Sequence, residues 1–360
     1  MKTTRRALLT GAAATSAMAA PALSTPAIAQ GTQEWRMVTS WPKNLPGPGV
    51  TAERLAERIR ICSGGRISVS VYAAGELVPA LSVFDAVAEG TAEMAHTASF
   101  FWQGRAPASV FFTAVPFGLT ADEHAAWIYH GGGGALWDTL YAPFAIKPFM
   151  AGNTGMQMGG WYNREINTVD DLKGLKIRMP GLGGDVMRAL GATPVSTPPS
   201  EIANALSSGL IDAAEFLGPW SDRAIGLPKV AKSYYWPGFH EPNGTGEALL
   251  SSSVWNSLDD DLREAVRTAC AAEDAVSRAE ADWQNAQNLS ALVEDGVTLR
   301  AYPDDVLAAA REAAGPVLAR FDDAGGVARD IYRSYMAARS VQAPWGRVGV
   351  GAFLEARDSV

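Results

Sequence analysis

A β-α-β-α-β alternation occurs twice in this 360-residue chain, and it constrains the fold more than any other feature. In the first block, period-two apolar patterns predict strands over 34–39, 66–72 and 93–97, with helices over 50–62 and 82–89 between them. The glycine- and proline-rich stretch 41–49 is expected to be a non-helical loop. Strands that alternate with helices form a parallel sheet covered by helices, so this block predicts one α/β lobe.

The second block begins near residue 153 and repeats the same order. We expect strands over 154–162, 175–179, 193–196 and 213–217, with short helices over 169–172, 184–190 and 199–207. A further strand over 244–253 is expected to return to the first lobe. The chain therefore reads as two similar α/β lobes rather than one large sheet.

The C-terminal third has the apolar spacing of helices. Apolar residues recur every three or four positions from Leu262 to Leu292, which predicts one helix over about 259–294. At a rise of 1.5 Å per residue such a helix is roughly 50 Å long, so it outruns one small lobe. We expect it to brace both lobes or to pack on a partner. Shorter helices are predicted over 303–314 and 327–338.

These patterns divide the chain into an ordered set of parts. We assign 30–152 and 217–255 to the first lobe, 153–216 and 256–294 with the spanning helix to the second, and 295–360 to C-terminal helices. Residues 1–29 stand apart from this division. They carry the pair Arg5-Arg6, a weakly apolar stretch and the small-x-small string Ala27-Ile-Ala29, which together predict a twin-arginine export signal cleaved near Ala29.

Charge and cysteine content narrow the class of partner. Residues 1–29 hold three of the 30 basic residues and none of the 38 acidic ones, so the remaining chain has a net charge of −11. Such an acidic protein is not expected to bind nucleic acid. An exported chain is expected in the periplasm, where Cys62 and Cys270 either pair or stay as buried thiols.

Arg178 is the first candidate for a binding residue. It ends the predicted strand 175–179 just before Pro180-Gly181, and ligand crevices of open α/β sheets lie at the carboxyl ends of strands. A guanidinium can hold a carboxylate through two parallel hydrogen bonds, which suits a small organic acid. The alternative is a surface arginine paired with an acid.

Gln157 and Glu215 are polar residues inside strands predicted to be buried. A carboxylate in such a place must be paired, protonated or bound to a cation. An amide oxygen and a carboxylate are hard ligands that suit Na⁺ or Ca²⁺. From the residues alone, an internal salt bridge and a cation site both remain open.

Other motifs give less support to a site. The run Gly131–Gly134 has no following Lys-Ser/Thr and is expected to be a flexible turn, and Gly181–Val186 lacks the third glycine of a dinucleotide fingerprint. No G-x-S-x-G string is present, and neither cysteine has a nearby histidine, so covalent catalysis has no support. The cluster Phe100-Phe-Trp102 is expected to wall a pocket or to fill a core.

Three longer strings resemble a known family: Thr39–Gly49, Gly218-Pro-Trp-Ser-Asp222 and Tyr234-Tyr-Trp-Pro-Gly-Phe-His-Glu241. With the export signal, the two lobes and the long helix, the chain resembles the DctP-type solute receptors, the extracytoplasmic subunits of TRAP transporters. It is most similar to their 2-oxoacid branch. The resemblance implies a two-lobed, type II periplasmic binding protein-like α/β fold with a long C-terminal helix.

The resemblance also implies roles for the candidate residues. Arg178 corresponds to the arginine that holds the ligand carboxylate. Gln157 and Glu215 correspond to ligands of a cation, Na⁺ or Ca²⁺, that also contacts the bound acid. Phe216 corresponds to a residue that offers its backbone carbonyl to this cation, and it stands where a tryptophan is expected.

Two further positions follow from the same resemblance. Phe101 corresponds to an aromatic residue that lines the pocket, and Glu241 lies in a matching Phe-His-Glu-Pro loop and is expected to contact the ligand. The implied function is the capture of a small 2-oxo or 2-hydroxy monocarboxylate such as pyruvate for TRAP membrane subunits, without catalysis. A homodimer with exchanged helices is also implied.

Other functions stay open at this point. A receptor of the same class could take a C4-dicarboxylate or another organic acid, for which a second basic residue in the pocket is expected. An exported cation-dependent lyase or hydrolase of small acids is the alternative from another class. A sensor that passes a signal to a membrane kinase is a third.

Overall fold

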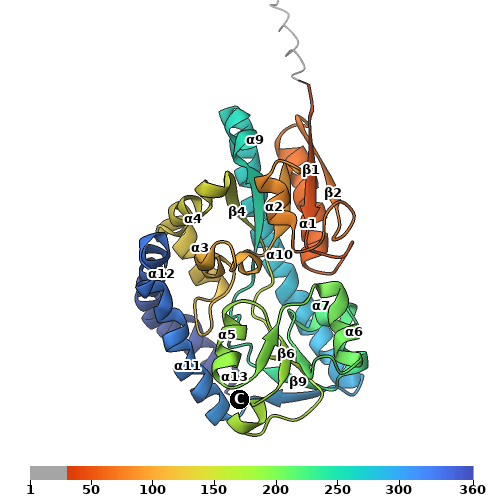
Figure 1. The fold of residues 1–360 in the computed structure, drawn as a ribbon, viewed down its shortest axis with the longest axis vertical. Helices are drawn as coiled ribbons and strands as arrows, with labels where there is room; N and C mark the ends of the chain where they lie inside the picture. The colour runs from red at the N-terminus through yellow and green to blue at the C-terminus, as the bar shows by residue number, and fades with distance from the viewer. Residues whose placement is uncertain (1–30, 360) are drawn as a thin grey trace, which may run out of the picture.

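The structure, a computed structural model, describes residues 31–359 and shows two lobes, each built around one sheet (Figure 1). The predicted export signal and its cleavage near Ala29 lie outside the described residues. The first sheet has the strand order β2-β1-β3-β10-β4. Its strands are β1 (Gln33–Thr39), β2 (Ile67–Tyr72), β3 (Met94–Thr97), β4 (Ile146–Asn153) and β10 (Thr245–Ser251).

The first three strands confirm the predicted parallel unit. β1 pairs in parallel with β2 and β3, and β10 then adds antiparallel to β3 and β4, as expected for a strand that returns from the other lobe. Helices α1 (Pro48–Cys62) and α2 (Val83–Ala88) connect them. α1 begins inside the stretch predicted to be non-helical, because a proline is tolerated at the first helical position.

A helical insertion covers one side of this lobe. It consists of η1 (Ser99–Trp102), η2 (Pro107–Phe112), α3 (Ala121–His130) and α4 (Gly133–Tyr141). The expected flexible turn at 131–134 is only partly correct, since Gly133 and Gly134 already belong to α4. A Cβ at Gly133 would lie 2.7 Å from the Trp127 ring, so glycine permits this close packing of α3 on α4.

The second sheet has the strand order β11-β9-β5-β8-β6-β7. Its strands are β5 (Gly160–Tyr162), β6 (Lys176–Arg178), β7 (Thr193–Val195), β8 (Ala213–Ala214), β9 (Ser233–Trp236) and β11 (Thr298–Ala301). Between them lie η4 (Val169–Leu172), α5 (Gly181–Ala189), η5 (Pro199–Glu201), α6 (Ile202–Ser207), α7 (Pro219–Ala224) and α8 (Leu227–Val230).

Two predicted strands of this lobe are much shorter than expected. Residues 154–159, predicted as strand, instead form a crossing between the lobes beside residues 238–244. Thr154 N donates to Gly244 O at 3.0 Å and Gln157 N donates to Glu241 O at 3.3 Å. The backbone N–H groups of Thr154 and Gln157 are thus satisfied by the other crossing segment, whereas that of Gly159 already donates to Tyr235 O in β9 at 2.7 Å. β8 ends at Ala214, so Glu215 lies just beyond it.

The assignment of residues 217–255 to the first lobe is wrong for its first part. β9 pairs with β5 and β11 in the second sheet, and α7 and α8 precede it in the same lobe. The chain returns to the first lobe only through the loop that leads to β10. Residues 295–360 are not purely helical either, because β11 pairs in parallel with β9.

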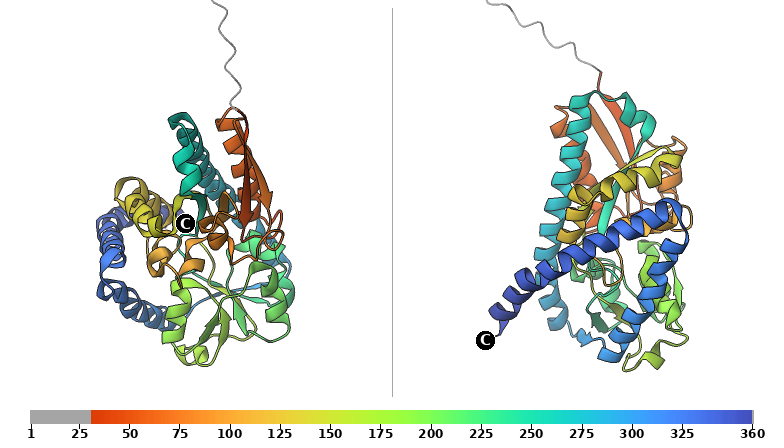
Figure 2. Two further views of the ribbon diagram at one scale, coloured as in Figure 1. Left: turned by 45° about the horizontal axis from the view of Figure 1, so that its top comes forward. Right: turned by 90° about the vertical axis from the view of Figure 1, so that its left-hand side faces the viewer.

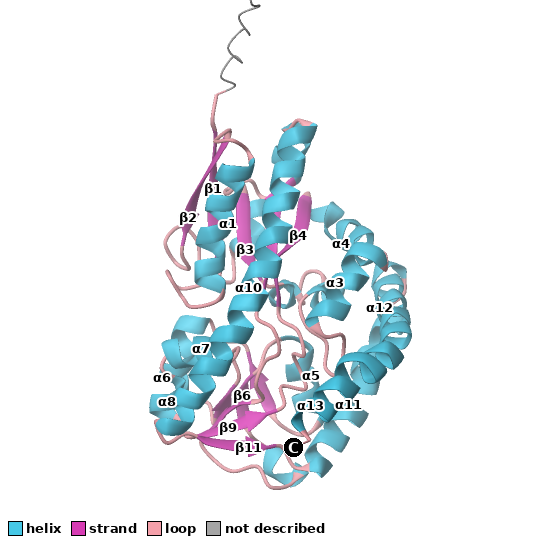
Figure 3. Cartoon of the chain, turned by 180° about the vertical axis from the view of Figure 1, so that it is seen from behind, coloured by secondary structure: helices cyan, strands magenta, loops and turns pink. Residues whose placement is uncertain are grey.

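Helix α10 (Asp260–Glu294) confirms the long spanning helix (Figure 3). Near its start it packs on α1, where Arg54 and Arg58 both bond to the buried Glu273. Farther along, Asn285 Oδ1 accepts a hydrogen bond from Trp220 N in the second lobe. One rigid helix therefore contacts both lobes.

The last two helices are longer than predicted. α11 (Asp304–Asp323) continues through Pro316, where we expected it to have ended, and buries Leu318 and Phe321 beyond that proline. α12 (Gly326–Gly346) continues through a π turn, η6 (Arg347–Gly351), into α13 (Ala352–Asp358). The views in Figure 2 show this C-terminal segment leaving the body of the molecule.

Neither expected state of the cysteines holds for both of them: Cys62 is exposed, Cys270 is buried, and both are free thiols. Among residues 31–359, no helix is long and apolar enough to cross a lipid bilayer.

Candidate binding site between the lobes

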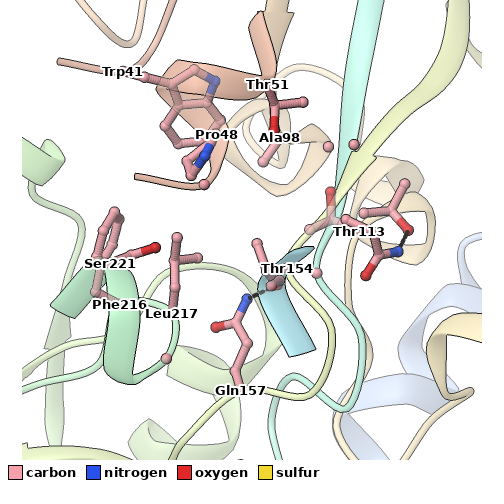
Figure 4. A pocket seen from close by; sticks show the side chains of 18 of the residues that line it. Trp41, Pro48, Thr51, Ala98, Thr113, Thr154, Gln157, Phe216, Leu217 and Ser221 are labelled. Atoms are coloured by element: carbon pink, nitrogen blue, oxygen red, sulfur yellow. Dashed lines mark hydrogen bonds between the residues drawn. The ribbon is translucent and has the colours of Figure 1, made fainter. Parts of the chain in front are cut away.

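A cavity lies between the two lobes at the level of the crossing segments. Together with its open mouth it encloses about 680 Å³ of empty space. Both lobes and the crossings contribute to its walls (Figure 4). Its lining includes Trp41, His96, Phe101, Thr154, Gln157, Arg178 and Phe216.

Arg178 is the last residue of β6 and is only 2% exposed. Its Nη1 donates to Glu215 Oε1 at 2.5 Å and to the Glu215 carbonyl at 2.7 Å, so the residue that follows β8 holds the guanidinium from one side. The Phe216 ring lies 5.6 Å from the guanidinium carbon. Nη2 has no hydrogen bond with residues 31–359, and the side chain lines the cavity. The arginine therefore keeps one donor group for a ligand.

Behind Arg178 lies a compact buried cluster of ionisable groups. Glu215, His240 and Glu241 each offer a ligand atom, and these atoms lie within 4.8 Å of one another. His240 Nε2 is 3.2 Å from Glu215 Oε2. Burial, followed by the repulsion of Glu215, raises the pKa of Glu241 well above its usual range. This shift favours the neutral form of Glu241, which leaves Glu215 as the carboxylate that pairs with Arg178.

Gln157 lies beside this cluster and is 2% exposed. Its Nε2 donates to Thr154 Oγ1 at 2.9 Å, whereas its Oε1 is buried without a hydrogen-bond partner among residues 31–359. A buried amide oxygen without a donor is costly unless something positive meets it. This orphaned oxygen and the Glu215–Glu241 carboxylates are oxygen donors that fit a hard cation such as Na⁺ or Ca²⁺.

The wall from the first lobe has a different chemistry. Trp41 Nε1 donates to His96 Nδ1 at 2.8 Å, and His96 Nε2 lies 3.1 Å from the Ala151 carbonyl. Burial lowers the pKa of His96 to about 4, so its ring is neutral at pH 7. Phe101 projects from η1, with its ring centroid 6.2 Å from that of Trp41. This side of the cavity is aromatic and uncharged.

The structure brings most of the predicted residues to one place. Arg178, Gln157, Phe101 and Phe216 line the cavity, whereas Glu215 and Glu241 lie behind its surface. Gln157 and Glu215 are buried as predicted, although neither lies within a strand.

Sequence reasoning missed several contacts at this site. His240 was not singled out, although it stands between Phe239 and Glu241 in a string that was. The partnership of Trp41 with His96 was also missed, since the two are 55 positions apart. Only the unusual composition of the two loops pointed to these residues.

A family profile described as "DctP: Bacterial extracellular solute-binding protein, family 7" matches residues 37–323. The chain belongs to this family. Because the family consists of extracellular solute-binding proteins, the expectation of a receptor rather than an enzyme is confirmed, as are the two-lobed fold class and the extracytoplasmic location.

Three relatives illustrate the match. A monocarboxylate 2-oxoacid-binding periplasmic protein of Nostoc sp. is 42% identical over 87% of this chain and 86% of its own length. A TRAP solute-binding protein of Bordetella bronchiseptica, solved as a mixed-occupancy dimer with calcium and picolinate, has TM-score 0.89 and 34% identity over 91% of this chain and 98% of that one. A TRAP solute-binding protein of Pseudoalteromonas atlantica with bound sodium and pyruvate has TM-score 0.87 and 36% identity, and the match covers 90% of this chain and 99% of that one.

Proposed function

We propose that this DctP-family receptor captures a small 2-oxo or 2-hydroxy monocarboxylate, such as pyruvate, together with Na⁺ or Ca²⁺, and delivers it to TRAP membrane subunits. The observation that carries the proposal is Arg178, a buried arginine at a strand end that lines the interlobe cavity with Nη2 free among the described residues. The pyruvate- and picolinate-bound relatives support the same ligand class.

Arg178 would bind the ligand carboxylate through its free Nη2. Its Nη1 is held by Glu215, so the guanidinium is already oriented and loses little conformational freedom on binding. Phe101 and Trp41 close the opposite side of the cavity and exclude water from the charged contact, which strengthens it. These steps bind and orient an acid, and none of them requires a change in its covalent bonds.

Gln157 Oε1, the Glu215 carboxylate and the Phe216 carbonyl would hold the cation, with Glu241 beside them. The positive charge that the cation supplies offsets the desolvation of the ligand carboxylate and of the acidic cluster. The fit of these residues rests on the amide oxygen of Gln157, which has no partner among residues 31–359, and on the two carboxyl groups gathered beside it.

The same cavity favours a monocarboxylate over a C4-dicarboxylate. Among the described residues that line it, Arg178 is the only arginine or lysine, and His96 is neutral at pH 7. A second carboxylate would therefore meet no permanent positive charge. A cation-dependent lyase or hydrolase does not fit this chain, because its family is one of binding proteins.

Calorimetry of the purified chain tests the proposal. Pyruvate, lactate and succinate are each titrated under three conditions: with Na⁺, with Ca²⁺, and without either ion. The third condition uses a chelator and replaces Na⁺ by a large organic cation. We expect stoichiometric binding of pyruvate or lactate only with Na⁺ or Ca²⁺, and no change in the acid afterwards. Tighter binding of succinate, or turnover of any of the three acids, would contradict the proposal.

We further propose a homodimer, but through a different helix from the one first expected. α10 packs along its own lobes, whereas residues 341–354 present exposed apolar side chains on the projecting segment. These are Val341, Trp345, Val348, Val350, Phe353 and Leu354. The expected sedimentation mass is that of two chains, and Trp345→Glu with Phe353→Glu should reduce it to one; a wild-type monomer at micromolar concentration contradicts the dimer.

A further inference from the structure

Thr154 is a polar residue of the first crossing segment that the proposed function does not use. Its side chain lines the cavity, three residues before Gln157, and its Oγ1 accepts a hydrogen bond from Gln157 Nε2 at 2.9 Å. A glutamine amide has two chemically different ends of nearly equal size, a carbonyl oxygen that accepts and an NH₂ that donates. Which end meets the acidic cluster therefore depends on what holds the other end.

We propose that Thr154 is a positioning residue that directs the oxygen of Gln157 toward the cation. The Thr154 hydroxyl donates to the Gly155 carbonyl at 3.4 Å, which leaves its lone pairs to accept from Gln157 Nε2. In Figure 4 the amide nitrogen is directed at Thr154, and the oxygen lies on the side of Phe216 and Leu217. This inference rests on the proposed function, because it concerns the same cation site.

Gly244 completes the arrangement from the second crossing segment. Its carbonyl accepts from Thr154 N at 3.0 Å, which fixes the backbone next to the hydroxyl. A Cβ at position 244 would lie 2.1 Å from Thr154 Oγ1 and 2.4 Å from Gln157 Nε2. Only glycine leaves room for this contact, so both crossing segments hold the amide in one orientation.

Without the Thr154 hydroxyl, the NH₂ end of the amide loses its 2.9 Å hydrogen bond and keeps only the neighbouring Glu241 carboxyl as a partner among the described residues. Rotation by half a turn would place the NH₂ where the oxygen now lies, and a donor there repels a cation. Groups that orient metal ligands typically affect metal affinity about ten- to a hundred-fold when they are removed. The effect should therefore be on cation affinity, with little effect on the carboxylate contact at Arg178.

The test is the Ca²⁺ concentration that gives half-maximal pyruvate binding, measured by calorimetry. Thr154→Val, which keeps the side-chain shape, should raise this concentration about ten- to a hundred-fold, and excess Ca²⁺ should restore binding. Thr154→Ser keeps the hydroxyl and should behave as the wild type. Thermal unfolding of the calcium-free proteins, expected to be unchanged, checks that both variants fold.

A double-mutant cycle isolates the orientation of the amide. Glutamate presents an oxygen whichever way it turns, so in a Gln157→Glu background Thr154→Val should change the Ca²⁺ requirement by no more than about twofold. An equal loss in both backgrounds, an unchanged Ca²⁺ requirement in Thr154→Val alone, or weaker binding that excess Ca²⁺ does not restore would overturn the inference. A wild-type chain that binds no acid at any Ca²⁺ concentration would instead refute the proposed function.

Discussion

The buried ionisable side chains on and beside the two sheets differ between the lobes, although the first lobe also pairs the buried Glu273 with Arg54 and Arg58 on its helical face. In the first lobe, burial lowers the pKa of His96 to about 4 and raises that of Glu247 to about 8, so both groups are neutral at pH 7. In the second lobe, Arg178 and Glu215 form an ion pair at 2.5 Å although both are almost fully buried. Nearby, Asp222 has a pKa raised by burial to about 6 and is mainly ionised at pH 7.

This difference separates two tasks of a binding cleft. The second lobe keeps charges in place before a ligand arrives, at the cost of desolvating them. The first lobe contributes a surface without charge, which removes water from an anion without competing for its partners. We infer that recognition of the carboxylate belongs to the second lobe and that the first lobe contributes mainly to its desolvation.

The largest expected effect is on the charged lobe. Arg178→Ala removes the carboxylate contact and leaves Glu215 buried without its partner, which costs about 3–5 kcal/mol for a broken buried pair. Pyruvate binding measured by calorimetry should disappear, and the melting temperature should fall. Arg178→Lys, which keeps the charge but not the planar fork, should retain stability better than affinity. Near-normal affinity in the alanine variant would refute the role of Arg178.

The second prediction concerns the neutral lobe and pH. The pKa of Glu247 is raised from 4.5 to about 8, so its contribution to folding is fully present below pH 4.5 and is lost as pH rises through 8. Glu247→Gln should remove this loss. The free energy of unfolding, measured with denaturant, should fall less in the variant than in the wild type between pH 5 and pH 9, and the difference should amount to a few kcal/mol. A difference that does not change with pH would mean that Glu247 is not held neutral.

The third prediction returns to the charged lobe. Glu215→Gln removes a charged oxygen from the proposed cation site and should raise the Ca²⁺ concentration needed for pyruvate binding by about ten- to a hundred-fold. Glu247→Gln is the matched control, since it neutralises a buried glutamate in the other lobe and should leave the Ca²⁺ requirement unchanged. If the two substitutions changed the Ca²⁺ requirement equally, the cation site could not be assigned to the second lobe.

The smallest effect is expected at the aromatic wall. Phe101→Ala should weaken pyruvate binding by about 1 kcal/mol, because it opens the neutral side of the cavity to water. The Ca²⁺ requirement, measured in the same titrations, should stay that of the wild type. The pyruvate affinity of Phe101→Leu should lie between those of the wild type and of Phe101→Ala. A shift in cation dependence would show that this wall does more than exclude water.

Local patterns predicted the parts of the site better than their connections. Arg178 was expected at a strand end and lies there, because strand alternation and the following proline are local signals. The strand predicted over 154–162 begins only at Gly160, because Thr154 and Gln157 bond to the other crossing segment, a partner some 80 residues away. α11 was predicted to end at 314, whereas the burial of Phe321 carries it past Pro316. Non-local pairing and burial override local propensity in such cases.

Periodicity and composition are properties of neighbouring residues, so they were enough to predict the two α/β blocks, the long helix Asp260–Glu294 and the presence of buried polar residues. Long-range packing was needed to place β9 in the second sheet, His240 against Glu215, and Thr154 and Gly244 around the Gln157 amide. These contacts join segments that the chain brings together only when both lobes have formed. Their geometry depends on packing, which no local pattern encodes.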